Sequence, residues 1–183
     1  HYKYDGGVMV TASHNPAEYN GFKLCREQAI PVSFETGIDR ISKLTKQYHP
    51  LRGEHLGKVI VSDIFVDYKK HVLKFASNLR HLRVVIDAGN GMAGKTIPLV
   101  CEGLPIEIIP LYFELDGSFP NHEANPLKPE NMVDLQKKVR ETRAHLGVAF
   151  DGDADRCVFV DEMGRIIGCD IITALIAKQI LER

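Results

Sequence analysis

Apolar residues in the second two-thirds of the chain alternate between short continuous runs and helical spacing. The continuous runs, which are typical of strands covered on both faces, lie at 83–89, 105–113 and 146–150. The segments with helical spacing lie at 92–103 and 130–144. In the second of these, Met132, Leu135 and Val139 fall on one face, which predicts an amphipathic helix.

The last part of the chain continues this pattern with shorter elements. An acidic turn at 151–156 follows the third apolar run, and 157–168 resembles a hairpin that turns at Met163-Gly164. Asp170 is placed to cap a final helix over 171–183. Strands that alternate with helices predict an α/β fold, a layered α/β/α domain with a mixed, mostly parallel sheet.

The first part of the chain carries fewer elements. Its pattern predicts strands at 6–11 and 20–25, a helix from Thr36 to Tyr48, an extended segment at 58–63 and a helix at 64–79. We therefore expect two domains, residues 1–60 and 61–183. The first holds too few elements for a core of its own, so we expect it to be an incomplete second α/β domain. Because the chain begins with His1 and a strand follows almost at once, we expect it to start partway through a longer protein.

Composition and charge narrow the classes of protein. The chain has 23 basic and 24 acidic residues without a basic block, which gives no footprint for nucleic acid. No apolar run reaches the roughly 18 residues of a membrane span, and no signal peptide pattern occurs. Four cysteines without metal or disulfide spacing predict a reducing compartment, the cytoplasm. They are Cys25, Cys101, Cys157 and Cys169.

The acidic turn is the first candidate site. Asp151, Asp153 and Asp155 stand at alternate positions, and three carboxylates this close repel one another unless a cation is present. Hard oxygen ligands at this density suit Mg²⁺ or Ca²⁺, whereas the other interpretation is a solvated Asp-Gly turn. An EF-hand calcium loop is disfavoured, because Arg156 stands where that loop needs glycine. Arg156 is also suited to bind a phosphate oxygen.

The loop between the first two predicted strands is the second candidate. It carries Ser13, His14 and Asn15 ahead of Pro16. Ser13 is either a hydrogen-bonding turn residue or a nucleophile, and a nucleophile needs a base or a charge-stabilising site. His14 is adjacent in sequence and does not by itself form a catalytic pair with the serine. Lys23, on the next strand, could come back across the loop.

The glycine stretch GNGMAGKT, residues 89–96, matches the phosphate-loop pattern G-x-x-x-x-G-K-[ST] after a strand and before a helix. A nucleotide-binding loop would use Lys95 and Thr96, yet it would explain neither the three aspartates nor the serine loop. Pro98, two residues later, is tolerated only within the first turn of a helix. We favour a packing turn in which glycines allow close approach, and a P-loop nucleotide-binding enzyme is the alternative.

Two stretches far apart carry a family resemblance. TASHNPAEYNGFK at 11–23 and DGDADR at 151–156 together resemble the α-D-phosphohexomutase family, specifically its bacterial phosphomannomutase/phosphoglucomutase branch. The segments at 84–94 and 110–131 also look like the second domain of that branch. The resemblance covers nearly the whole chain, and it explains the glycine stretch as a packing turn.

The resemblance implies a phosphoserine mechanism. Ser13 would carry a phosphoryl group, and Mg²⁺ would be held by Ser13, Asp151, Asp153 and Asp155. The phosphoryl group would pass to the free hydroxyl of a hexose 1- or 6-phosphate. The resulting hexose 1,6-bisphosphate would turn round and return its other phosphoryl group, so that the reaction is an isomerisation. Phosphoryl transfer needs positioning and charge neutralisation above all, which such a site would supply.

The resemblance also implies further roles. Lys23 would be a general acid or base, and His14 would orient groups around the serine. Lys23, Asp155 and Arg156 would bind the substrate. Ala12 and Ala154 stand where some members carry glycine, and neither change removes a functional group.

Length is the larger departure from the family pattern. Members have four domains, whereas this chain would hold the end of the first domain and all or most of the second. We therefore expect the isolated chain to bind Mg²⁺ at best, without converting hexose phosphate, and to need the missing domains of the same enzyme. A non-catalytic Mg²⁺- or Ca²⁺-binding module is the remaining alternative.

Overall fold

The computed structural model describes residues 2–47 and 57–182. The chain divides into two compact units, the first made of His1–Thr11 and Asn20–Asp63, the second of Ala12–Tyr19 and Ile64–Arg183. The serine loop therefore belongs to the same unit as the acidic turn, although 138 positions separate Ser13 from Asp151.

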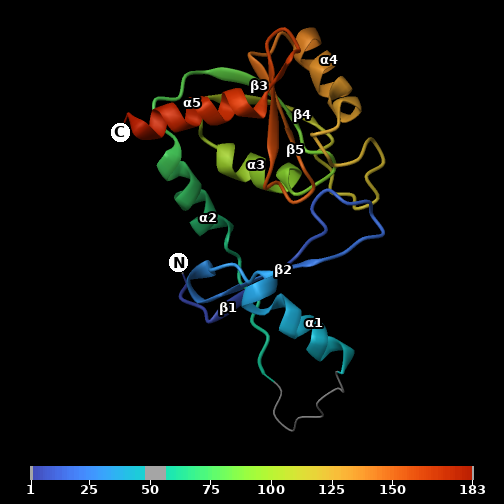
Figure 1. Ribbon diagram of the computed structural model, residues 1–183. Helices are drawn as coiled ribbons and strands as arrows, with labels where there is room; N and C mark the ends of the chain where they lie inside the picture. Colours follow the sequence, from blue (N-terminus) through green and yellow to red (C-terminus); the bar gives the residue numbers. More distant parts are fainter. Residues whose placement is uncertain (1, 48–56, 183) are drawn as a thin grey trace. The chain divides into compact units, whose positions relative to one another are not determined.

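The first unit contains a two-stranded antiparallel sheet. Its strands are β1 (Gly6–Val10) and β2 (Phe22–Arg26), with Val8 opposite Leu24 (Figure 1). Both strands were predicted from their apolar runs and are confirmed. The helix α1 (Asp39–Lys46) follows them.

The start of α1 differs from the prediction, which put it at Thr36. A single wide turn, Phe34–Ile38, comes first, and Ser33 caps it. The backbone N–H of Thr36 donates to Ser33 Oγ at 3.2 Å, and the backbone N–H of Ser33 donates to Thr36 Oγ1 at 2.7 Å. This reciprocal capping satisfies the first amides, so the regular helix begins only after the turn. Tyr48, the predicted end, lies outside the described residues.

The second unit is built on a five-stranded sheet (Figure 1). Across the sheet the strands are β4 (Ile106–Leu111), β3 (Leu82–Asp87), β5 (Leu146–Phe150), β6 (Cys157–Asp161) and β7 (Ile166–Ile167). The first three are parallel, and β6 runs antiparallel to both of its neighbours. Four strands thus share one direction, which confirms the predicted mixed, mostly parallel sheet.

Helices cover both faces of this sheet. α4 (Val133–Thr142) lies on one face and α3 (Ala93–Cys101) on the other (Figure 1). Fully buried on the α4 face are Val85, Met132, Leu135, Val139 and Val160. Buried on the α3 face are Val84, Ile86 and Val148, with Ile97 packed against them. Alternate residues of β3 therefore serve the two cores, as strand geometry requires, and the predicted α/β/α layering is confirmed.

Two local predictions need correction. The helix predicted at 64–79 ends earlier, as α2 (Phe65–Val72) followed by a 3₁₀ turn at Leu73–Phe75. The segment 58–63, which was predicted to be extended, belongs to no helix or strand, and its valines at 59 and 61 are almost fully exposed.

The second correction concerns Asp170, which does not cap the last helix. α5 (Cys169–Leu181) begins after Gly168, and no side chain caps it. Asp170 lies inside the first turn, where a carboxylate interacts favourably with the positive end of the helix dipole. An aspartate near the start of a helix can be either the N-cap or a residue of the first turn. Here the non-helical backbone of Gly168 makes Gly168 the N-cap and places Asp170 in the first turn.

Three loops start together at the carboxyl ends of neighbouring parallel strands. The carboxyl ends of β3, β4 and β5 lie side by side, with Asp87 paired to Leu111 and Ala149. The glycine stretch, the long connection after β4 and the acidic turn start from these ends. Open α/β sheets usually bind ligands at the carboxyl ends of their strands.

Candidate functional site

The acidic turn directly follows β5 and is held closed by its own backbone. Asp151 N–H donates to Arg156 O at 3.2 Å, and Ala154 N–H donates to Asp151 O at 3.0 Å. Asp151 is fully buried, Asp153 is half-buried and Asp155 is exposed, and one carboxylate oxygen from each lies within 4.8 Å of the others. The three aspartates are thus brought together as a set of hard oxygen donors.

Arg156 balances part of this negative charge. Its Nε and Nη2 donate to Asp151 Oδ2 at 3.0 and 2.7 Å, and its backbone N–H donates to Asp151 Oδ1 at 3.1 Å. Asp151 is therefore a fully buried carboxylate with charged and neutral donors, which is the condition for burying a charge. Arg156 Nε also lies 3.5 Å from Asp155 Oδ1.

The serine loop meets the acidic turn at the hydroxyl of Ser13. Ser13 Oγ lies 3.1 Å from Asp151 Oδ2 and 3.4 Å from Asp153 Oδ1, and it accepts a hydrogen bond from Arg156 Nη2 at 2.7 Å. The backbone of Ser13 is left-handed, with φ of 56°. Non-glycine residues rarely adopt this conformation, and here it belongs to the turn that brings the hydroxyl to the carboxylates.

His14 contacts the same group of side chains. Its Nδ1 lies 3.5 Å from Ser13 Oγ and contacts Nη2 of Arg156. A guanidinium can only donate, so Nδ1 of His14 is the acceptor in this contact. Because its Nδ1 contacts Arg156, His14 lies beside Ser13 but is not arranged as the general base of the serine.

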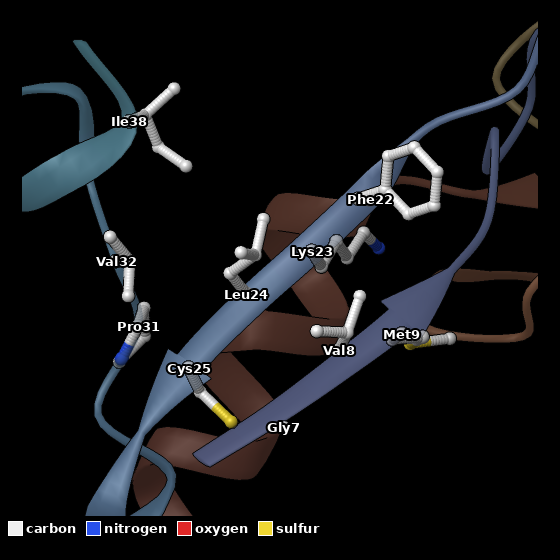
Figure 2. A pocket seen from close by; sticks show the side chains of 10 residues that line it. All are labelled: Gly7, Val8, Met9, Phe22, Lys23, Leu24, Cys25, Pro31, Val32 and Ile38. Atoms are coloured by element: carbon white, nitrogen blue, oxygen red, sulfur yellow. The ribbon is translucent and has the colours of Figure 1, made fainter. Parts of the chain in front are cut away.

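Lys23 lies in the other compact unit. It is an exposed residue of β2 opposite Met9, and it lines a groove with apolar side chains that include Val8, Leu24 and Ile38 (Figure 2). Its predicted roles as general acid or base and as substrate ligand stay predictions.

The glycine stretch packs against backbone. A Cβ at Gly91 would lie 2.7 Å from Gly152 O, and one at Gly94 would overlap the carbonyl group of Phe113, 2.8 Å from its carbon. Met92 N–H donates to Gly152 O at 2.9 Å. The backbone of Gly152 and of Phe113 therefore leaves no room for side chains at Gly91 and Gly94, and the packing-turn interpretation accounts for these two glycines.

Lys95 also points away from a phosphate-binding arrangement. Its Nζ lies 5.0 Å from the centre of the Phe65 ring, at the start of α2. This cation–π contact ties α2 to α3.

Sequence reasoning missed a buried ion pair beneath the site. Asp87, at the end of β3, is fully buried, and its Oδ2 lies 3.0 Å from His122 Nε2. The hydrogen bond with Asp87 raises the pKa of His122, although burial acts in the opposite direction. The sequence carries only a weak indication of this pair. Asp87 stands at the carboxyl end of an apolar strand next to the glycine turn, and His122 stands in the long loop after the next strand.

Comparisons with known proteins agree with this geometry. Residues 63–164 match the family model described as phosphoglucomutase/phosphomannomutase, alpha/beta/alpha domain II, and residues 1–51 match that of domain I. The chain belongs to the phosphoglucomutase/phosphomannomutase family. The resemblance seen in the serine and acidic motifs is thereby confirmed.

Curated relatives of this family align along the whole chain. A protein of Xanthomonas campestris pv. campestris named "Phosphohexose mutases" is 43% identical over 185 residues, which cover all of this chain and 41% of the relative. A phosphomannomutase of Salmonella montevideo is 40% identical over 195 residues, which cover all of this chain and 42% of that relative. The chain thus spans about two fifths of the length of these phosphohexomutase relatives.

Solved structures share the fold. A phosphoglucomutase/phosphomannomutase family protein of Burkholderia thailandensis gives a TM-score of 0.83 at 34% identity, over 98% of this chain and 38% of that one. A structure from Thermus thermophilus gives 0.79 at 23% identity, over 98% of this chain and 42% of that one, and shows the shared fold alone. Within residues 2–47 and 57–182, no helix has the length and apolar character of a membrane span.

Proposed function

We propose that this chain supplies the phosphoserine loop and the metal-binding loop of a phosphohexomutase, which moves phosphoryl between the 1- and 6-positions of a hexose phosphate. The observation that carries the proposal is the position of Ser13 Oγ, within 3.4 Å of two aspartates and 2.7 Å from Arg156. Two loops separated by about 140 positions thus place a hydroxyl among carboxylates and a guanidinium. The relatives named phosphomannomutase and phosphohexose mutases support a hexose phosphate as substrate.

Charge supports a divalent cation at this site. Three carboxylates surround one guanidinium, and a phosphoryl group on Ser13 would add about −1.5 to −2 charge units. Such an excess of negative charge requires a cation. Ser13, Asp151, Asp153 and Asp155 would hold Mg²⁺, whose preference is for oxygen ligands. When bound, Mg²⁺ supplies neutralisation of the charge on the phosphoryl oxygens.

The residues of this chain supply the groups that act in one phosphoryl transfer. The bond between Ser13 Oγ and phosphorus breaks while a bond forms between phosphorus and the free hydroxyl oxygen of the hexose phosphate. The proton of that hydroxyl passes to a base, for which Lys23 is the candidate, and the oxygen left on Ser13 is stabilised by the hydrogen bond from Arg156 Nη2. The reverse step, from the hexose 1,6-bisphosphate, restores phosphoserine and completes the isomerisation.

The remaining side chains have supporting roles. His14 orients the guanidinium through its contact with Arg156 Nη2. The exposed carboxylate of Asp155 and the accessible part of Arg156 face substrate. The isolated chain binds the metal without turning over hexose phosphate, because a mutase must hold both ends of a bisphosphate and these loops provide one transfer centre. Turnover by the 183-residue chain alone would refute this last statement.

Phosphopeptide mass spectrometry after incubation with a hexose 1,6-bisphosphate tests the proposal. We expect one phosphate, on Ser13, in the wild-type chain and none in Ser13→Ala. Thr11→Ala is the matched control, because it removes a neighbouring hydroxyl and leaves Ser13 in place. Phosphate on another residue, or none in the wild-type chain, would count against the phosphoserine role.

The same preparation separates the two alternatives. Binding of ATP that is abolished by Lys95→Ala would indicate a P-loop enzyme. Mg²⁺ or Ca²⁺ binding without any phosphoserine would indicate a non-catalytic metal-binding module.

A further inference from the structure

The long loop between β4 and α4, residues 112–128, is anchored to the glycine stretch through Asn90. Asn90 Nδ2 donates to Glu114 O at 2.9 Å, and Asn90 Oδ1 accepts from Asn121 Nδ2 at 2.8 Å. Its backbone carbonyl accepts from the N–H of Asp116 at 3.1 Å. Asn90 is 6% exposed, so these bonds replace water and hold the two loops together.

A second connection between the same loops is the ion pair of Asp87 and His122. Asp87 Oδ1 accepts from the Gly89 N–H at 2.9 Å, and Asp87 Oδ2 lies 3.0 Å from His122 Nε2. His122 Nδ1 lies 2.8 Å from Glu123 O. A carboxylate and a carbonyl can only accept, so both ring nitrogens donate and His122 is the imidazolium. The His122 side chain is only 14% exposed, which makes the pair a buried support.

The charged groups around His122 come from two elements, and the neutral hydroxyl of Tyr112 lies with them. Asp87 belongs to β3, and Asp134 belongs to α4, where its Oδ2 accepts from the hydroxyl of Tyr112 at 2.8 Å. The Tyr112 ring lies 5.3 Å from the His122 ring, edge to face. Burial, with the hydrogen bond to Asp134, raises the pKa of Tyr112 to about 12, so this tyrosine stays neutral between pH 6 and 9. The hydrogen bond with Asp87 raises the pKa of His122, so the imidazolium persists to higher pH than that of an ordinary histidine.

Both connections lead to Gly152, the residue between two of the aspartates. From the glycine stretch, Met92 N–H donates to Gly152 O at 2.9 Å. From the long loop, the Ala124 methyl group lies 3.7 Å from the position of a Cβ on Gly152, and Ala124 is 2% exposed. A shift of the glycine stretch would therefore move the backbone that joins Asp151 to Asp153.

We propose that Asp87, Asn121 and His122 are positioning residues, which hold Gly152 and thereby set the spacing of the aspartates that bind the metal. None of the three lies among the proposed ligands, and their influence passes through Gly89, Asn90 and Met92. This inference rests on the proposed function, because it concerns the same metal site. It assigns a role to the NHEA segment, residues 121–124, beyond stabilising the fold.

Calorimetric titration of the 183-residue chain with MgCl₂ tests this role. We expect His122→Ala to weaken Mg²⁺ binding by about tenfold, the lower end for residues that orient ligands indirectly. His122→Gln, which can still donate to Asp87, should recover part of the affinity. His71→Gln is the matched control, because His71 is an exposed histidine of α2 whose ring contacts Phe75, and its affinity should equal that of the wild type.

The pH dependence of the Mg²⁺ affinity distinguishes a positioning role of His122 from a purely structural one. The pKa of His122 is raised in the folded chain, so the stabilisation by the pair is complete below the ordinary pKa of about 6.5 and is lost as pH rises through the folded value. Between pH 6 and 9 we therefore expect the Mg²⁺ affinity of the wild-type chain to fall. The affinity of His122→Gln should change less over this range.

Hydrogen exchange gives a test that needs no metal. The Met92 amide, bonded to Gly152 O, should exchange faster in His122→Ala, whereas the Gly164 amide, bonded to Asp161 O in the distant hairpin, should not change. Wild-type Mg²⁺ affinity and Met92 protection in folded His122→Ala would overturn the inference and leave the proposed function standing. Failure of the wild-type chain to bind Mg²⁺ would overturn the metal site and this inference together.

Discussion

The glycine stretch, residues 89–96, and the serine loop, residues 12–19, differ in how well their own sequence motif describes their surroundings in the fold. The glycine stretch fits a phosphate-binding pattern literally, yet its glycines face the backbone of Gly152 and Phe113, and its lysine lies over an aromatic ring. The serine loop has little local signature, yet its hydroxyl meets aspartates and an arginine from far along the chain. Spacing within a segment describes what the segment could do, whereas the neighbours supplied by the fold decide what it does.

The largest expected effect tests the packing role of the glycine stretch. In Gly94→Ala the added methyl group overlaps the carbonyl of Phe113, and backbone is less able to yield than a side chain. We expect the free energy of unfolding to fall by about 2–3 kcal/mol, as in overpacked cores. Urea denaturation followed by circular dichroism measures it.

Gly117→Ala is the control for this substitution, because nothing lies within 4 Å of a Cβ there. Its unfolding free energy should change by less than about 0.5 kcal/mol, the range of ordinary surface substitutions. Equal stability of the two variants would show that the close approach at Gly94 is not required.

The next effect tests the acidic turn as a metal site. In the wild-type chain, Mg²⁺ at about one hundred times its dissociation constant should stabilise the fold by about 2.7 kcal/mol, and EDTA should reverse this. In Asp151→Asn this gain should largely disappear, because the buried carboxylate between Ser13 and Arg156 loses its charge. Thermal unfolding with and without Mg²⁺ measures the difference.

Asp161→Asn makes the same chemical change outside the acidic turn. The Asp161 carboxylate accepts from the backbone of Arg165 and Met163 in the hairpin, and these bonds lower its pKa. This variant can lose stability of its own but should keep the full Mg²⁺-dependent gain. A Mg²⁺ effect that survives in Asp151→Asn would place the cation elsewhere.

The local pattern of apolar residues was sufficient to predict most of the helices and strands. The spacing of Met132, Leu135 and Val139 predicted a buried helix face, because a helix buries residues that recur every three or four positions. Leu135 and Val139 form that face of α4, and Met132 lies in the 3₁₀ turn just before it. The continuous run of β3 likewise predicted a strand covered on both faces. The start of α5 was misplaced at Asp170, because the choice of N-cap depends on the backbone of Gly168 as well as on the acidic side chain.

The site could be predicted only in part. Asp151, Asp153 and Asp155 are close in sequence, so their grouping follows from local geometry. The meeting of Ser13 with Arg156, 143 positions away, depends on the fold and was expected only through the family resemblance. The pair of Asp87 and His122 was not predicted, because a loop must fold back over 35 positions to form it. Where Lys23 acts stays a prediction.

The smallest expected effect returns to the glycine stretch and separates its two interpretations. Lys95 is an exposed residue whose ammonium group lies over the Phe65 ring. Lys95→Ala should therefore lower the unfolding free energy by about 0.5–1 kcal/mol, the range for exposed cation–π pairs. Lys95→Arg keeps a cation over the ring and should stay close to the wild type.

Nucleotide titration completes this comparison. A phosphate-binding loop uses its lysine to hold the phosphates, so its loss would remove nucleotide affinity altogether. For a packing turn, wild-type and Lys95→Ala chains should show the same negligible heat on addition of MgATP, while the difference in stability remains. Saturable MgATP binding in the wild-type chain that is lost in Lys95→Ala would contradict the packing role. The phosphate-loop pattern would then be a better guide to the function of residues 89–96 than the residues that they contact in the fold.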